Sequence, residues 1–256
     1  MDILILKSLA ALAVFLVAIL GGGIPLFARL KNKSQAMLFY GDFFARGIFI
    51  GAAFIHLLPE ALSNMALAIP HFQYPVVFTL CAFTIFAVQF IEQGVMKFCH
   101  FSKKAAMQWV PFLLMTLLSI HSLIAGAALG LGETLGHIII IFIAIIAHKG
   151  AAAFALGVSM RTAHLTKKIA FRIILLFAIM TPVGIFAGTL FDAYSHAHSA
   201  LMGEAIFNAI AAGTFFYIAT FHHSELEVDE SLHSSLAEIL YFGLGIAVMA
   251  LVAIWL

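Results

Sequence analysis

Eight long apolar segments, separated by short polar connections, decide what this chain can fold into. A helix needs roughly 20 apolar residues to cross the hydrocarbon core of a bilayer. The 256 residues are 64% hydrophobic and only 10% charged, which leaves too few charges to cover a water-facing surface. We therefore predict an all-α integral membrane protein with one transmembrane domain over residues 1–256. The predicted spans are 3–28, 37–62, 75–96, 109–131, 136–160, 169–190, 204–222 and 235–256.

Arginine and lysine gather in alternate connections between these spans. The first, third and fifth connections carry them, whereas the second, fourth and sixth carry none. The residues are Arg29, Lys31, Lys33, Lys97, Lys103, Lys104, Arg161, Lys167, Lys168 and Arg172. Cytoplasmic loops are enriched in basic residues, so we predict a multi-pass protein of the cell membrane with both termini extracytoplasmic. The net charge of +1 gives no basic footprint for nucleic acid.

Two histidines lie in the middle of the fourth and fifth predicted spans. His121 begins the phrase HSLIAG, and His148 begins the phrase HKGAAA. An ionisable side chain inside hydrocarbon is unfavourable, so it usually faces a bundle interior, a partner or a polar pathway. A single such histidine is more often an interior residue than a ligand, but two on successive spans favour a shared site. Since Zn²⁺ accepts neutral imidazole readily, the pair indicates a metal or proton route across the membrane.

Further polar residues extend this route. His56 and Glu60 are four residues apart and share a helix face, where they can share a proton or bind one divalent cation. Glu92 would be costly as a lone anion inside the third span, so we expect it to be protonated for part of the time or paired, with Lys149 as its counter-charge in the bundle. The remaining candidates are Asn208 in the seventh span, with His223 and Glu225 at its cytoplasmic end.

Pairs of small residues punctuate three of the spans. The pairs are Gly47 with Gly51, Gly126 with Gly130, and Gly184 with Gly188. Small residues four apart let helix backbones approach closely in lipid, so we predict that these glycines serve helix packing rather than ligand binding.

The phrases around the two histidines resemble a known family. Residues 121–130, HSLIAGAALG, are similar to the fourth-span signature of ZIP (Zrt/Irt-like) divalent metal transporters. Residues 148–150, HKG, resemble the fifth span of the animal-type His-Lys subfamily. Supporting matches are HLLPEAL at 56–62, EQ at 92–93, MTPVGI at 180–185 and AAGTFFYI at 211–218. The resemblance runs in the right order over essentially the whole chain.

This resemblance implies a fold and a function. Spans one to three and six to eight would form inverted repeats around spans four and five. A bundle of spans one, four, five and six would slide against spans two, three, seven and eight, in an elevator-type mechanism within a homodimer in lipid. The activity implied is import of divalent transition-metal ions into the cytoplasm, zinc first and iron or manganese as alternatives. Neither an enzymatic reaction nor a cofactor other than the transported ion is implied.

The chain departs from the family at several carboxylates. The family normally has a glutamate at the place of Ala125, and members with a two-metal site have a ligand at the place of Ala152. The animal-type subfamily usually has a glutamate at the place of Asn208 and another near His223. A divalent ion held only by neutral imidazoles lacks an offsetting charge, so we expect weak binding of one ion at most.

The predicted metal site lies between the fourth and fifth spans, and the predicted pathway leads to and from it. We expect His121 and His148 to hold the ion, with Ser122, water or another span completing the site. The residues expected to guide metal ions or protons are His56, Glu60, Glu92, Lys149, Asn208, His223 and Glu225.

Three alternatives stay open on the sequence. The first is a ZIP-like protein that binds metal with weak or altered transport, as Ala125 and Asn208 suggest. The second is a membrane zinc hydrolase, which needs an acidic residue near three histidines to activate a zinc-bound water. The third is a haem-bearing electron carrier with His121 and His148 as axial ligands.

Overall fold

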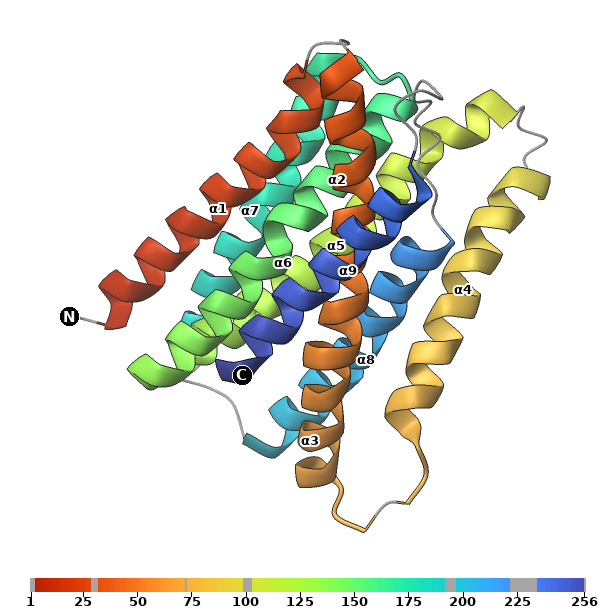
Figure 1. The fold of residues 1–256 in the computed structure, drawn as a ribbon. Helices are drawn as coiled ribbons and strands as arrows, with labels where there is room; N and C mark the ends of the chain where they lie inside the picture. The colour runs from red at the N-terminus through yellow and green to blue at the C-terminus, as the bar shows by residue number, and fades with distance from the viewer. Residues whose placement is uncertain are drawn as a thin grey trace.

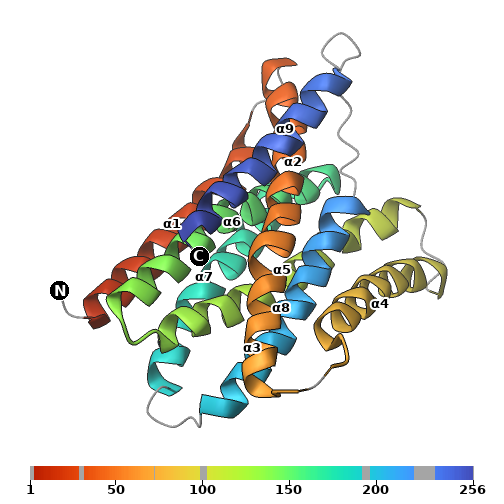
Figure 2. The same ribbon diagram turned by 60° about the horizontal axis from the view of Figure 1, so that its bottom comes forward.

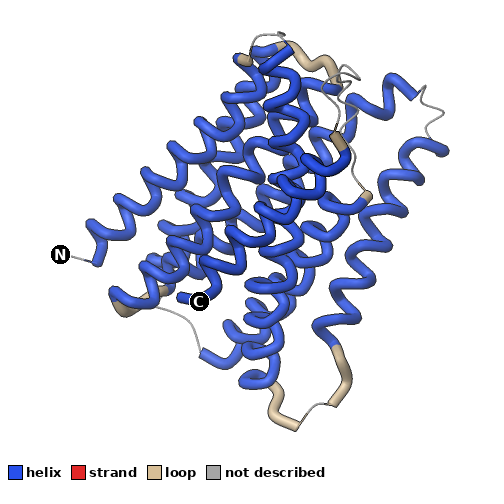
Figure 3. Tube along the Cα trace, in the orientation of Figure 1, coloured by secondary structure: helices blue, strands red, loops and turns tan. Residues whose placement is uncertain are grey.

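The computed structural model describes residues 3–28, 32–71, 73–98, 103–191, 197–221 and 234–255. These residues are almost entirely helical, and no strand occurs among them (Figures 1 and 3). The elements are α1 (Ile3–Phe27), α2 (Asn32–Gly51), η1 (Ala52–Leu57), α3 (Leu58–Ala68), α4 (Val76–Phe98), α5 (Lys103–Leu131), α6 (Leu135–Thr162), α7 (Lys167–Phe191), α8 (Ala197–Thr220), α9 (Ser235–Val252) and η3 (Ala253–Trp255).

The described residues include eight helical segments long and apolar enough to cross a membrane, which confirms the all-helical, eight-span prediction. The largest difference in bounds is in the second span. That span runs from Gln35 to Ala68, whereas the sequence predicted an end at residue 62. The helix continues through the polar residues Ser63 and Asn64, which are exposed and half-buried, for nearly two further turns.

The second span contains a π-helical segment, η1, which carries His56. Pro59 follows within the first residues of α3. A proline lacks an N–H and its ring crowds the carbonyl four residues earlier, so the turn before it widens readily. Single π-helical turns of this kind often occur at functional sites, because they change the direction in which side chains leave the helix.

The helices divide into two bundles. Helices α1, α5, α6 and α7 make their most extensive contacts with one another, and α2, α3, α4, α8 and α9 do the same. The contacts between the bundles are smaller and run chiefly from α2 to α6 and from α5 to α8. Helices α1 and α4 lie at opposite edges of the molecule in two views that differ by 60° (Figures 1 and 2).

Glycines bring helices into backbone contact inside each bundle. A methyl group added to Gly126 would meet the Thr181 carbonyl oxygen and would lie 3.1 Å from the Gly184 Cα. Gly130 lies equally close to Gly188, so both glycine pairs join α5 to α7. In the other bundle, Gly47 and Gly51 face α9. The packing role predicted for these three pairs is therefore confirmed.

Two cationic side chains tie α1 to its own bundle. Lys7 is buried, and its Nζ donates a hydrogen bond of 2.6 Å to the Gly130 carbonyl near the end of α5. Arg161, at the end of α6, donates to the Pro25 carbonyl and, at 2.9 Å, to the Ala28 carbonyl. Carbonyls at helix ends lack intrahelical partners and attract cations, so each end of α1 is held by such a contact.

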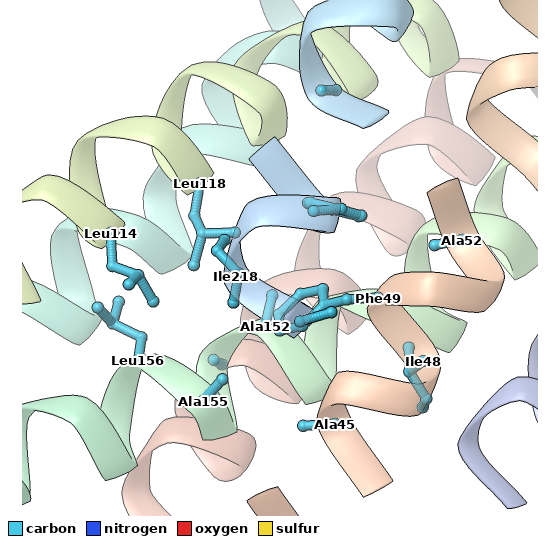
Figure 4. Close-up of a cluster of buried hydrophobic side chains, with 14 of the residues drawn as sticks. Ala45, Ile48, Phe49, Ala52, Leu114, Leu118, Ala152, Ala155, Leu156 and Ile218 are labelled. Carbon is cyan, nitrogen blue, oxygen red and sulfur yellow. The ribbon is translucent and has the colours of Figure 1, made fainter. Parts of the chain in front are cut away.

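A large apolar cluster fills the region where the two bundles meet (Figure 4). It combines Phe49 of α2, Leu118 of α5, Ala152 of α6 and Ile218 of α8, all of them buried. Helices from both bundles therefore share one buried apolar core.

Candidate metal centre

His121 and His148 meet at the contact between α5 and α6. Their Nε2 atoms lie 3.3 Å apart, and their ring centroids are separated by 5.4 Å. The residues are 7% and 3% exposed, so the pair is shielded in the protein interior. The antiparallel course of the two helices joins these residues, which are 27 positions apart in the sequence.

The separation of the two nitrogens suits a shared metal ion. Zn²⁺ binds imidazole nitrogen at about 2.0–2.1 Å in tetrahedral geometry, and two such ligands lie about 3.3–3.4 Å from each other. The observed distance is 3.3 Å. Without a metal, the same distance allows one neutral ring to donate its N–H to the other. The rings are thus placed so that one ion can be bound with little movement of either helix.

His56 approaches this pair from the second bundle. Its ring centroid lies 6.3 Å from that of His148, and its Nδ1 lies 3.6 Å from the Glu60 carboxylate. Glu60 is close enough to Glu204, near the start of α8, for the two carboxyl groups to interact electrostatically. Glu204 interacts electrostatically in turn with His137 in the first turn of α6. Polar groups therefore extend from the histidine pair toward the end of the molecule that carries the α3–α4 connection.

Glu204 and His137 had no role in the sequence analysis. Glu204 stands four residues before Asn208 on the same helix face, which was the only signal available for it. His137 lies in the turn that follows the N-cap of α6, where the Thr134 hydroxyl accepts a hydrogen bond of 3.3 Å from the His137 backbone N–H.

Lys149 forms a separate polar cluster beside the histidines. Its Nζ donates to the Ser122 hydroxyl at 2.8 Å, the Thr181 hydroxyl at 2.9 Å and the Phe177 carbonyl at 3.3 Å. The Nζ also lies 3.6 Å from the centroid of the Phe177 ring. These three oxygen atoms surround the amino group, and each lies within hydrogen-bond distance of Nζ. The expected pairing of Lys149 with Glu92 is therefore wrong.

Ser122, expected beside the metal, accepts a hydrogen bond from Lys149. Glu92 lies half-buried on α4, and its carboxylate makes no hydrogen bond or ion pair within the described residues. Asn208 is buried on α8, one turn before Ala211. His223 and Glu225 lie outside the described residues.

A small cavity adjoins His121 between α5 and α8. Its volume is about 60 Å³, and its lining is apolar except for His121 and the Thr214 hydroxyl. A space of this size holds an ion or a few water molecules but not a porphyrin. The haem-carrier alternative also needs nitrogens on opposite faces of an iron, about 4 Å apart at ordinary bond lengths, and the observed 3.3 Å is too short for that.

The described part of the chain contains no group of three or more His, Cys, Asp or Glu side chains placed to hold one metal ion. Ala125 and Ala152, at the positions where the family has ligands, contribute no donor atoms. A tetrahedral ion bound to the two imidazoles would therefore need further ligands from water or from other side chains. The described residues also lack three ligands placed around one ion, with an acidic group beside them, which a zinc hydrolase requires.

Phe215 covers the histidine pair and had been given no role. Its ring centroid lies 4.7 Å from that of His121 and 5.7 Å from that of His148, with interplanar angles of 66° in both contacts. Phe49 packs against Phe215, with the ring centroids 5.0 Å apart. Both phenylalanines are 0% exposed. The sequence phrase 211–218 contains Phe215, but one apolar ring in an apolar span carries no signal of its own.

A buried ion pair on α2 was also missed. Arg46 and Asp42 are four residues apart and 8% and 7% exposed, and the Arg46 guanidinium donates to the Asp42 carboxylate. Arg46 also lies 5.1 Å from the centroid of the Phe43 ring. The i, i+4 spacing of opposite charges inside an apolar span was the signal that could have revealed this pair.

Comparison with known proteins identifies the family of this chain. The sequence profile of the ZIP zinc transporters matches residues 4–108 and 100–253. The human zinc transporter ZIP2 is 26% identical over 258 positions, covering 82% of each chain, and ZIP2 of Mus musculus is 25% identical over the full length of both. Protein zntD of Dictyostelium discoideum is 36% identical over 149 positions, which cover 57% of this chain and 22% of that protein. The chain is therefore a member of the ZIP zinc transporter family, whose proteins carry metal ions across membranes.

Proposed function

We propose that this chain imports divalent transition-metal ions, zinc foremost, into the cytoplasm and binds one ion at a time between His121 and His148. The observation that carries the proposal is the 3.3 Å separation of the two Nε2 atoms, which suits a shared tetrahedral ion. The exclusion of both residues from solvent gives them no ordinary surface role.

The route to this site begins at Glu60, Glu204 and His56. Carboxylates attract the hydrated cation, and His56 offers the first nitrogen as water is lost. After the histidine pair, the ion leaves toward the cytoplasmic end of α8, where His223 and Glu225 follow in the sequence. Glu92 and Asn208 line the second bundle and tune the route, whereas Lys149 and Ser122 keep α5, α6 and α7 together beside it.

The division of the helices supports a proposal for the mechanism. His121 and His148 both belong to the bundle of α1, α5, α6 and α7, so an ion bound to them would move with that bundle. We propose that it slides as an elevator against the other bundle, across the smaller contacts between α2 and α6 and between α5 and α8. Inverted repeats, extracytoplasmic termini, one transmembrane domain and a homodimeric assembly complete the proposal.

Binding at this site is weak for a physical reason. Two neutral imidazoles offer no charge to offset a divalent ion in a low-dielectric interior. Weak binding suits a carrier, because the ion must leave as readily as it enters. Nitrogen ligands favour late first-row metals over Mg²⁺ or Ca²⁺.

Metal uptake by cells that produce the chain tests this assignment. We expect His121→Ala and His148→Ala to lose most zinc uptake, because each removes half of the predicted ligand pair. His164→Asn is the matched control: His164 is exposed and has a φ of 54°, a conformation that asparagine tolerates. Uptake equal in all four proteins, at equal surface abundance, would exclude the site. Zinc binding by the unaltered chain without uptake would instead favour a metal-binding role with weak transport.

A further inference from the structure

The position of the Phe215 ring against His121 and His148 points to a role in transport. Phe215 lies on α8 of the second bundle, but its ring covers His121 and His148 of the first bundle. Phe49, on α2, packs against the Phe215 ring, with the ring centroids 5.0 Å apart. The contacts between Phe215 and the two imidazoles therefore cross the boundary between the bundles.

The two phenylalanines lie on one side of the histidine site. Phe49 precedes His56 by seven residues, so it lies about 10 Å farther along the span, away from Glu60. In the proposed orientation this is the cytoplasmic side. Exposure falls in the same direction, since the side chains of Glu60 and His56 are 31% and 14% exposed and both phenylalanines are 0% exposed.

A second polar group lies beyond the phenylalanines. Asp42, Arg46 and Phe49 have the spacing i, i+4 and i+7, which places them on one face of α2. The Asp42–Arg46 ion pair is thus the next charged feature on this face toward the cytoplasm. Two polar regions are separated by a layer of aromatic rings, and an ion cannot cross such a layer without losing its ligands and its water.

We propose that Phe215, supported by Phe49, is the cytoplasmic gate of the histidine site. While Phe215 covers the imidazoles, the site is closed toward the cytoplasm. Movement of the first bundle relative to the second separates the histidines from the ring, and this separation opens the path to the Asp42–Arg46 side. The direction of opening rests on the proposed function, whereas the closure itself rests on the ring contacts.

Thiol labelling tests the gate without requiring transport. Ala152 lies one turn after His148, is 3% exposed and belongs to the same apolar cluster as Phe49 (Figure 4). The Ala152→Cys change is made in a Cys81→Ala, Cys99→Ser background. The full chain is then labelled in sealed vesicles of known orientation with a maleimide that cannot cross membranes. A buried thiol in apolar surroundings reacts slowly, so the starting rate is low.

Adding Phe215→Ala should raise labelling from the cytoplasmic face by roughly tenfold or more, because water then reaches the site. Labelling from the other face should stay unchanged. Phe216→Ala is the matched control. The Phe216 ring packs against Phe54, with the ring centroids 4.4 Å apart, and within the described part of the chain it has no ring contact with His121 or His148. Phe215→Leu and Phe49→Leu keep apolar bulk and should give smaller increases, and they replace Phe215→Ala if that variant does not reach the membrane.

Equal labelling in the Phe215 variants and the Phe216→Ala control would overturn the gate. An increase confined to the extracytoplasmic face would also overturn it. Because labelling needs no bound metal, the gate can fail while the uptake test of His121 and His148 succeeds, and the reverse also holds.

Discussion

Two polar clusters lie side by side on the same pair of helices and have opposite chemistry. His121 meets His148 across α5 and α6, and their sequence neighbours Ser122 and Lys149 meet across the same helices. Consecutive residues leave a helix about 100° apart, so each pair points to a different side. The histidines present neutral nitrogens that can accept a cation, whereas the Lys149 amino group already has three acceptors.

This difference separates a site that exchanges its occupant from one that does not. Lys149 has three hydrogen-bond partners, and these partners, Ser122, Phe177 and Thr181, belong to α5 and α7. The Lys149 cluster therefore joins three helices of the first bundle. The histidine pair contacts the second bundle instead, through His56 and Phe215. We infer that the Lys149 cluster stabilises the bundle and that the histidine pair serves the ion.

The largest loss of stability should follow Lys149→Ala. The change leaves two buried hydroxyls and a carbonyl without their donor and creates a cavity, so the free energy of unfolding should fall on the order of 3 kcal/mol. Heating the detergent-solubilised protein and measuring the folded fraction by size-exclusion chromatography checks this. Lys168→Ala, at an exposed position on α7, is the control. Equal stability of the two variants would remove the structural role of Lys149.

The next largest effect should come from Gly126→Ala. The added methyl group would collide with the Thr181 carbonyl and push α7 away from α5, which should destabilise the bundle by about 2 kcal/mol. Gly136→Ala meets no atom within 4 Å, so it should change stability by less than about 1 kcal/mol, in the stabilising direction. The same heating assay compares the two, and an unchanged Gly126→Ala variant would show that the α5–α7 contact is less tight than described.

A smaller effect is expected for Thr181→Val. The side chain keeps its shape but loses the hydroxyl that accepts from Lys149, which should reduce stability by about 1 kcal/mol. Thr116→Val controls for the loss of a hydroxyl, because Thr116 is exposed and donates only to the Phe112 carbonyl of its own helix. If both variants behave alike, the hydrogen bond to Lys149 adds nothing measurable.

The smallest change in stability is expected for His148→Gln without metal, about 1 kcal/mol or less, since polarity and much of the volume are kept. Its response to zinc should differ most. Zinc at 100 times its dissociation constant should stabilise the unaltered protein by about 2.7 kcal/mol, and this gain should vanish in the variant. Lys149→Ala should behave in the opposite way, with low stability and a retained response. A zinc response that survives His148→Gln would break the distinction between the two clusters.

The sequence was enough to predict the membrane class, the number of candidate spans and the proximity of His121 and His148. Apolar length and the cost of buried ionisable groups act locally, so they can be read from one chain. The partner of Lys149 was predicted wrongly, because charge matching pointed to Glu92 while the structure places neutral acceptors from α5 and α7 around the amino group. Phe215, Glu204 and the Asp42–Arg46 pair were not recognised.

The sequence by itself determined that this chain has eight segments long and apolar enough to cross a membrane, with one imidazole within each of two of them, since hydrophobicity and burial cost depend on residue type and segment length. Only the tertiary structure decided which groups face one another. The rotation of α5 and α6 sends His121 toward His148 and Ser122 toward Lys149, and packing between the bundles places Phe215 over the imidazoles. Such rotations follow from close packing of whole helices, to which every side chain along the interface contributes, and no short motif encodes them.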